Sequence, residues 1–281
     1  MTFRLFALTL FAMLAFAGNS LLCRIALKQT AIDPATFVAI RIVSGALMLW
    51  GVLALRRQST RLEGTWAGAL ALLAYAMAFS FAYTHIPAGT GALLLFGAIQ
   101  ISMILYGLAI GERLSPLQCA GMALAVTGLV ALMLPSADAP PVFYGFLMIL
   151  SGVAWSVYSL LGRGAKNPAA ATAGNFIRAA PVALALLLAQ FVASHVRIDA
   201  AGAGYAVASG AVTSGLGYIL WYAALKQLNV TRAATVQLSV PVLAALGGTL
   251  FLDEPLTALL VAASALVLAG VSLVIAAKRR V

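Results

Sequence analysis

Long apolar segments alternate with short polar breaks along the whole chain. A helix needs about 20 residues to cross the hydrocarbon core of a bilayer, and ten segments of that order can be placed. They run approximately over residues 5–27, 34–55, 64–84, 88–110, 115–135, 143–162, 170–193, 203–224, 231–252 and 256–276. The segments are about twice as long as a barrel strand and do not alternate, which disfavours a β-barrel. The pattern therefore predicts an all-α integral membrane protein with ten transmembrane helices.

Composition agrees with a membrane location. Hydrophobic residues make up 63% of the 281 residues and charged residues only 9%, with a mean hydropathy of +1.05. Soluble domains carry about 25% charged residues, so this chain lacks the polar side chains to cover a water-facing surface. The net charge of +10 does not form a basic groove, because the 17 Lys and Arg residues are scattered. A water-soluble enzyme, a nucleic-acid binder and a secreted disulfide scaffold are excluded.

The positive charges predict the orientation in the membrane. With ten spans both termini lie on one side, and that side collects twelve Lys and Arg residues against three on the other. Because the cytoplasmic side carries the excess of positive charge, we expect both termini in the cytoplasm and the chain in the bacterial inner membrane. Ala15-Phe16-Ala17 before Gly18 also resembles a signal-peptidase site, so a cleaved signal peptide is the alternative for the first segment.

The two halves of the chain resemble each other. Four short stretches recur in the same order at offsets of 137 to 142 residues. The matches join residues 20–24 to 159–163, 40–41 to 177–178, 111–115 to 253–257, and Gly128 to Gly270. Each unit has five spans, so the second enters the membrane from the opposite side. The sequence predicts two inverted five-helix repeats, 1–137 and 142–281, around a central cavity, an architecture of many secondary transporters.

These features resemble a known family. Ten spans in two repeats, the turns Gly-Glu-Arg-Leu-Ser (111–115) and Asp-Glu-Pro-Leu-Thr (253–257), and the two repeated glycines are similar to EamA-type members of the drug/metabolite transporter superfamily. That family usually has a proline 13 residues before the turn glutamate; Pro241 supplies it in the second half, whereas Ile99 stands there in the first. The resemblance implies a carrier of small metabolites, most similar to bacterial exporters of aromatic and other amino acids.

Arg41 and Arg178 are the charges predicted well inside spans. Insertion of such a charge at a helix centre costs roughly 2.5–3.5 kcal/mol, although a long side chain can also extend to the interface. The inverted repeat suggests two gating pairs, Arg41 with Glu254 near the outer mouth and Arg178 with Glu112 near the inner mouth. The alternative for both glutamate turns is structural, with Ser115 or Thr257 capping the helix that follows.

Aromatic and amide side chains on spans 1, 3, 4, 6, 8 and 9 are the candidates for a substrate pocket. Aromatic residues recur every four positions on spans 3 and 8, which places each set on one helix face. Amides in apolar helices need a polar partner. Packing or an interfacial belt is the alternative explanation for the aromatic residues. The candidate substrate-binding residues are Asn19, Tyr75, Phe79, Tyr83, Gln100, Trp155, Tyr158, Tyr218, Tyr222 and Gln237.

The missing motifs narrow the function further. All seven acids fall in loops or at span ends, which leaves no midplane carboxylate for a proton relay, and no Walker motif for ATP hydrolysis is present. We therefore expect facilitated or exchange-type export of small molecules by alternating access, in a monomer within the lipid bilayer that uses no metal or cofactor. A drug, nucleobase or other metabolite carrier of the same fold is the alternative. An intramembrane enzyme or a channel ranks lower, because no nucleophile–base set and no ring of charges is found.

Overall fold

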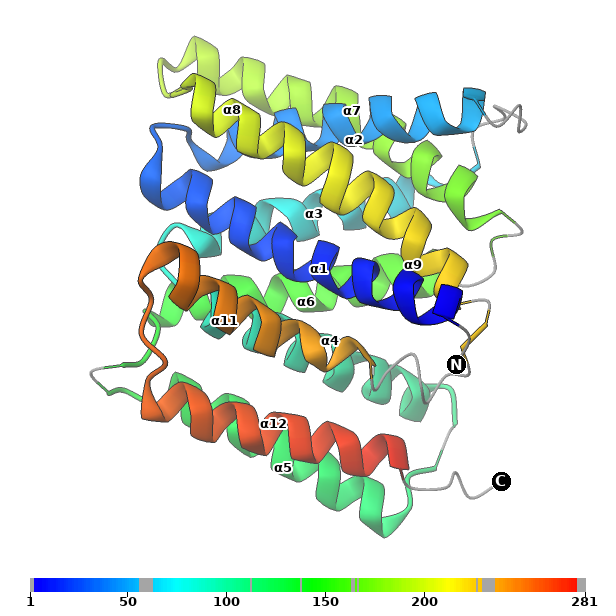
Figure 1. Ribbon diagram of the computed structural model, residues 1–281, viewed down its shortest axis with the longest axis vertical. Coiled ribbons are helices and arrows are strands. Elements are labelled where there is room, and N and C mark those ends of the chain that lie inside the picture. Colours follow the sequence, from blue (N-terminus) through cyan, green and yellow to red (C-terminus); the bar gives the residue numbers. More distant parts are fainter. Residues whose placement is uncertain are drawn as a thin grey trace.

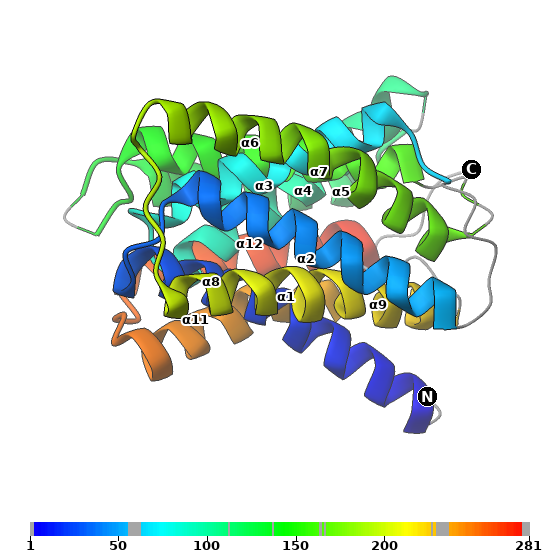
Figure 2. The same ribbon diagram turned by 90° about the horizontal axis from the view of Figure 1, so that it is seen from above.

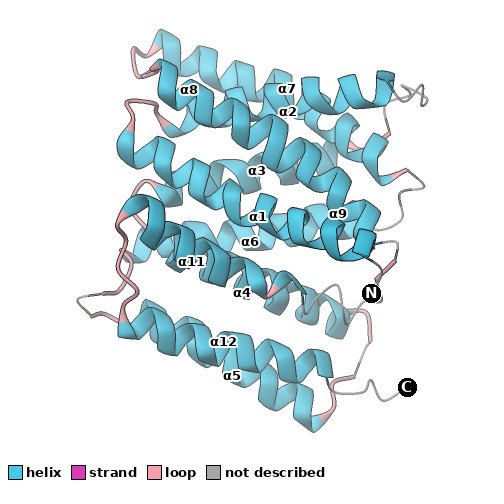
Figure 3. Ribbon diagram, in the orientation of Figure 1, coloured by secondary structure: helices cyan, strands magenta, loops and turns pink. Residues whose placement is uncertain are grey.

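The computed structural model describes residues 3–55, 63–111, 113–136, 138–162, 165, 167–225, 227–228 and 236–276. All regular elements in these ranges are helical (Figure 3). They are α1 (Phe3–Gln29), α2 (Pro34–Leu55), α3 (Trp66–Tyr83), α4 (Ala88–Ala109), α5 (Pro116–Met133), α6 (Val142–Gly162), α7 (Pro168–Val192), α8 (Ala200–Val207), the π-helix η1 (Ala208–Leu216), α9 (Gly217–Leu225), α11 (Ser239–Leu252) and α12 (Ala258–Ala276).

Within the described ranges these elements form ten helical segments, because α8, η1 and α9 follow one another without a break. Eight of the helices are long and apolar enough to cross a membrane, and α11 is a shorter apolar helix of 14 residues. The prediction of a ten-helix membrane bundle is confirmed. Most boundaries agree with the hydropathy pattern within three residues, but α11 begins at Ser239 rather than near residue 231; residues 229–235 lie outside the described part of the chain.

Contacts between helices follow the two-fold relation expected of inverted repeats. Matching helices of the two halves pack on each other: α2 on α7, α4 on α11, and α5 on α12 (Figure 1). Other contacts occur twice, once from each half. The contact of α1 with α9 is matched by that of α6 with α3, and the contact of α1 with α11 is matched by that of α6 with α4. Figure 2 shows α6 and α7 on one face of the molecule and α1 and α11 on the other. The two halves therefore pack against each other along most of their helices.

The repeated glycines bring α5 and α12 close together. A Cβ on Gly270 would lie 2.5 Å from the carbonyl oxygen of Gly121, and one on Gly128 would lie 2.8 Å from Val267. Small residues at such positions allow close approach of helix backbones in membranes. The glycine motif therefore explains the packing of this helix pair at the edge of the bundle.

The helix that follows each glutamate turn begins with a cap. Ser115 accepts a bond from the backbone N–H of Gln118, whose side chain accepts the N–H of Ser115 in return, so that a capping box begins α5. Thr257 accepts the N–H of Leu260 at 3.2 Å at the start of α12. The structural interpretation of Ser115 and Thr257 is confirmed.

The two ends of the bundle differ in which loops they hold. The start of α1 and the end of α12 lie at one end, here called the proximal end, on the right in Figure 1. The opposite end, called the distal end, holds the α1–α2, α3–α4, α7–α8 and α11–α12 connections. The charge pattern predicts that the distal end faces the outside of the cell.

Candidate substrate cavity

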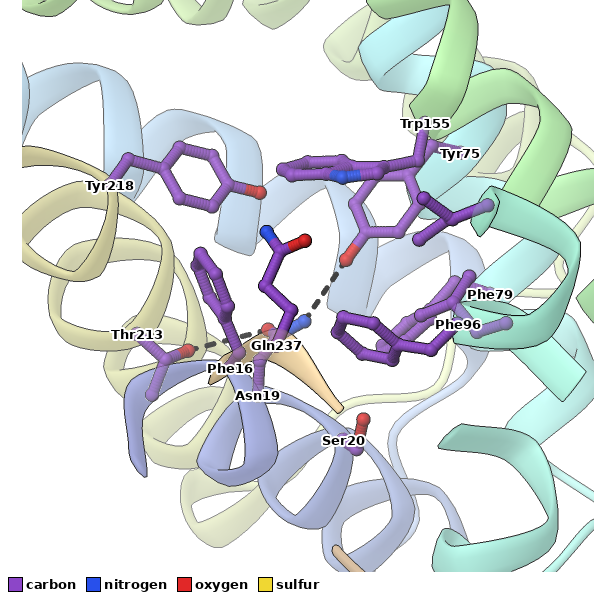
Figure 4. A pocket seen from close by; sticks show the side chains of 12 residues that line it. Phe16, Asn19, Ser20, Tyr75, Phe79, Phe96, Trp155, Thr213, Tyr218 and Gln237 are labelled. Carbon is purple, nitrogen blue, oxygen red and sulfur yellow. Dashed lines mark hydrogen bonds between the residues drawn. The ribbon is translucent and has the colours of Figure 1, made fainter. Parts of the chain in front are cut away.

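A cavity lies between the two halves, and its empty space, open solvent included, is about 410 Å³. Side chains from α1, α3, α4, α6, η1 and α9 form its wall, together with one residue just before α11 (Figure 4). The lining residues are Phe16, Asn19, Ser20, Tyr75, Phe79, Leu95, Phe96, Ile99, Trp155, Thr213, Tyr218 and Gln237. A mostly apolar wall with a few polar groups is typical of small-molecule sites.

Six of the twelve described lining residues are aromatic. Trp155 stands between Tyr75 and Tyr218, with ring centroids 4.8 Å and 5.2 Å away. Phe16 packs edge-on against Tyr218, at 6.1 Å. Because Tyr75 and Trp155 come from different repeats and meet across the cavity, the rings join the two halves while leaving flat faces for a ligand.

Asn19 organises the polar part of the wall. Its Nδ2 donates to the hydroxyl of Tyr75 at 3.2 Å, and its Oδ1 accepts bonds from Ser209 at 2.8 Å and Thr213 at 3.3 Å. Both donors to Oδ1 belong to the π-helix η1, a helix type that is rare and often found at functional sites. Gln237 makes no side-chain hydrogen bond within the described residues, and Figure 4 shows its amide pointing between the hydroxyls of Tyr75 and Tyr218.

Arg41 lies directly behind this wall. Its guanidinium is 5.3 Å from the ring centroids of both Tyr75 and Phe79, and its side chain is only 1% exposed. Nη2 donates to the hydroxyl of Tyr75 at 3.2 Å and Nε donates to Ser214 at 3.3 Å. Nη1 is buried without a hydrogen-bond partner in the described structure. Arg41 therefore does not extend to the membrane interface, and it places a positive charge beside the cavity.

The predicted pair of Arg41 with Glu254 is wrong for this structure. Glu254 instead accepts a bond from Nε of Arg24 at 2.8 Å, with both side chains buried. Arg24 reaches Glu254 because α1 packs against α11, which ends at Leu252 just before Glu254. Arg41 lies deeper in the bundle and is occupied by Tyr75 and Ser214. Arg24 is one of the three Lys and Arg residues counted on the side opposite the termini, and that count gives no signal for its pairing with Glu254.

The Arg24–Glu254 pair ties the distal end together. Arg24 also donates to the carbonyl oxygens of Tyr83 and Thr84, at 2.8 Å and 3.0 Å, in the α3–α4 turn. The other oxygen of Glu254 accepts the backbone N–H of Ala88, at 2.6 Å, at the start of α4. One buried ion pair thus connects α1, the α3–α4 turn and the α11–α12 turn.

Arg178, the repeat counterpart of Arg41, has a different setting. Its Nη1 donates to the carbonyl oxygen of Glu63 at 2.9 Å, just before α3, and to that of Gly174 at 3.0 Å. Glu112, its predicted gating partner, lies outside the described residues, so that pair stays a prediction.

The structure brings six of the ten candidate binding residues into the cavity wall: Asn19, Tyr75, Phe79, Trp155, Tyr218 and Gln237. The other four do not line it. Tyr83 packs edge-on against Phe79 at 4.7 Å and donates to the carbonyl of Ala88, one turn nearer the distal end. Tyr158 contacts Thr172 at 3.5 Å. Gln100 and Tyr222 are partly buried outside the wall.

Sequence reasoning did not select the other six lining residues. Phe16 could have been found, because the repeat alignment places it opposite Trp155. Ser20 and Thr213 resemble many other small hydroxyl residues in the spans and carry no sequence signal of their own. Leu95, Phe96 and Ile99 are apolar side chains on the apolar helix α4.

Relatives agree with this architecture. The chain is 55% identical over 274 residues to an uncharacterized protein of Pseudomonas aeruginosa, which covers 97% of this chain and 95% of that one. It is 27% identical over 209 residues to a probable terminal-alkyne amino-acid exporter of Streptantibioticus cattleyicolor, covering 74% of this chain and 70% of the relative. A solved crystal structure matches with a TM-score of 0.68 at 21% identity, over 95% of this chain and 94% of that one, which shows the shared fold.

Ten helical segments in two inverted repeats, with a cavity between them, define the architecture of a multi-pass membrane transporter. One family model matches the chain twice, over residues 4–134 and over residues 142–276. The chain belongs to the EamA-like transporter family.

Proposed function

We propose that this protein exports small metabolites, amino acids including aromatic ones first among them, from the bacterial cytoplasm by alternating access. The observation that carries the proposal is the aromatic cavity shared by the two repeats, beneath a distal end tied together by the Arg24–Glu254 pair. The name of the Streptantibioticus relative, a probable terminal-alkyne amino-acid exporter, supports the substrate class.

The chemistry of the wall suits an amphipathic solute. Flat rings such as Trp155 accept an apolar side chain, while Asn19, Tyr75 and Gln237 offer hydrogen-bonding groups to the polar part. The described lining residues include no acid, which favours facilitated or exchange-type transport over a proton relay within the cavity.

Movement between the two open states requires the distal end to separate. In our proposal the Arg24–Glu254 pair breaks when the repeats rock against each other, which opens the cavity to the outside. Both charges remain near the distal end, where they can gain water as they part. In our proposal both termini lie in the cytoplasm and the Arg24–Glu254 pair closes the outer end of the cavity. All the described lining residues come from a single copy of the chain.

Solute efflux from liposomes containing the purified protein tests this proposal. We expect saturable, selective efflux of phenylalanine, tryptophan, threonine or methionine, compared with nucleobases, cationic dyes and protein-free liposomes. Trp155→Ala is expected to lower efflux of the aromatic amino acids at least tenfold, because it removes a ring from the wall. Trp50→Ala, at a 53% exposed position on α2, is the matched control and leaves efflux unchanged. Efflux of all these amino acids at the protein-free rate would contradict the proposed function.

A further inference from the structure

The hydroxyl of Tyr75 has only its proton left to offer to a ligand. It accepts one bond from Nδ2 of Asn19 and a second from Nη2 of Arg41, both at 3.2 Å. A hydroxyl has two acceptor lone pairs and one donor proton, so these two bonds occupy both lone pairs. Tyr75 donates to no other described residue, and its ring lines the cavity (Figure 4). The free proton of Tyr75 therefore requires an acceptor, and the cavity is where a ligand can supply one.

The positive charge of Arg41, behind Tyr75, determines which kind of acceptor suits the Tyr75 hydroxyl. Arg41 forms no ion pair in the described structure, where Arg24–Glu254 is the recorded salt bridge. Its Nη1 is also a buried donor without a partner. Bonds from a cation strengthen the donor ability of the hydroxyl that receives them. The Arg41–Tyr75 unit is therefore a positively polarised donor that favours an anion over a neutral acceptor.

The remainder of the wall limits the anion to one charge and an apolar body. Arg41 is the one cation that contacts lining residues in the described chain, whereas a phosphate dianion calls for several cations or a bidentate arginine fork. A carboxylate carries a single negative charge, which matches the single positive charge of Arg41. The rings of Phe79 and Trp155 flank Tyr75 at 5.3 Å and 4.8 Å and provide the apolar contact.

No comparable group recognises an ammonium ion. The lining residues include no acid, and the buried carboxylate of Glu254 is occupied by Arg24 and the N–H of Ala88. Among the described lining residues an ammonium group meets ring faces, the amide oxygen of Gln237 and the hydroxyl oxygens of Ser20 and Thr213, which are all uncharged and weaker partners than a carboxylate.

We infer that the Arg41–Tyr75 unit binds the carboxylate of the substrate and that the amino group is dispensable, so that the site takes aromatic and other apolar monocarboxylates as well as amino acids. This inference rests on the proposed function, because it assigns the substrate class of the same cavity. It concerns binding, however, and binding can be measured in detergent without transport.

Four ligands with one benzyl group test the inference by calorimetric binding to the purified full chain: phenylalanine, 3-phenylpropionate, phenylalaninamide and phenethylamine. We expect 3-phenylpropionate to bind within about tenfold of phenylalanine. The two ligands without a carboxylate are expected to bind at least about 30-fold more weakly, in line with loss of a hydrogen bond to a charged group.

Two variants identify the residues responsible. Tyr75→Phe keeps the ring and removes the hydroxyl, and it is expected to weaken both carboxylates about 10- to 100-fold while changing phenethylamine less than threefold. Arg41→Met has the same expected pattern, and Tyr75→Phe remains decisive if Arg41→Met does not fold. Tyr83→Phe is the matched control on the same helix, because its hydroxyl bonds to Ala88 outside the wall; it preserves the selectivity.

The outcomes separate the inference from the proposed function. Equal binding of 3-phenylpropionate and phenethylamine, a requirement for the amino group, no binding of either carboxylate, or unchanged selectivity in Tyr75→Phe would each overturn the inference. Carboxylate-selective binding without efflux from liposomes would keep the inference and overturn the proposed function.

Discussion

Arg41 and Arg178 occupy equivalent positions in the two repeats but have different surroundings. Arg41 is enclosed by side chains, bonds to Tyr75 and Ser214, and leaves Nη1 without a partner in the described structure. Arg178 is partly exposed and donates to backbone carbonyl oxygens, including that of Glu63 just before α3. A duplicated helix unit therefore kept its packing symmetry while the chemistry of the two copies diverged. The charge in one copy lies behind the wall of the candidate cavity, and the charge in the other bonds to the connection before α3.

Removal of each arginine should produce the largest difference between the repeats. Arg41→Met is expected to lower efflux of phenylalanine about 100-fold, because the donor unit behind the cavity loses its charge. Arg178→Met is expected to lower efflux less than tenfold and mainly to reduce thermal stability, because it loses bonds to Glu63 and Gly174. Efflux from liposomes, normalised to protein content, measures both. Equal losses would show that the two copies play equal roles.

The buried ion pair offers the next largest effect. Glu254→Gln leaves the charge of Arg24 buried without its partner, which typically costs about 3–5 kcal/mol. The double variant Arg24→Met with Glu254→Gln removes both charges and is expected to recover more than half of that loss. Thermal unfolding in detergent measures the cycle. Additive effects of the two single variants would contradict a direct coupling between these side chains.

Two glycine substitutions compare a position at a tight helix–helix contact with a position that has open space around it. Gly270→Ala places a methyl group against Gly121 and Ala125 and is expected to destabilise the protein by about 1–3 kcal/mol. Gly204→Ala meets no atom within 4 Å on α8 and is expected to stabilise it by about 0.5–1 kcal/mol. The unfolding midpoints in detergent should shift in opposite directions. A shift in the same direction would mean that close approach is not why Gly270 is a glycine.

The smallest difference concerns the two helix caps. Ser115→Ala removes one half of a reciprocal capping box and is expected to cost about 1 kcal/mol. Thr257→Ala removes a single bond of 3.2 Å and is expected to cost about 0.5 kcal/mol. Thermal unfolding of the two variants side by side checks this order, and a larger loss for Thr257→Ala would reverse our comparison.

The fold was predictable from the sequence because the bilayer restricts the choices. Ten apolar segments of spanning length and an internal repeat were enough to define the helices and their inverted relation. The π-helix η1 had no comparable signal, because Ser209, Thr213 and Ser214 are as compatible with an α-helix as with the wider turn.

The site was predictable only in part. Helical spacing placed Tyr75, Phe79 and Tyr83 on one face of α3. Tyr83 does not line the cavity, because it lies at the distal end of α3, where its hydroxyl bonds to Ala88 at the start of α4. The partner of Glu254 could not be found from hydropathy, since Arg24 and Arg41 both lie near distal helix ends and only the packing of α1 brings Arg24 to the turn. Local patterns thus indicated which side chains share a face, whereas the pairing of charges depended on the tertiary arrangement.

Accessibility of the cavity from the distal side tests the central claim most directly. The test uses Thr213→Cys, which places a thiol in the wall, in a chain whose Cys23 and Cys119 are replaced by alanine. A membrane-impermeant thiol reagent is applied from outside the cell, with and without the additional Glu254→Gln change. We predict little labelling while the Arg24–Glu254 pair is intact and at least tenfold faster labelling once it is broken. Equal and rapid labelling in both backgrounds would contradict a carrier whose cavity is closed at its distal end.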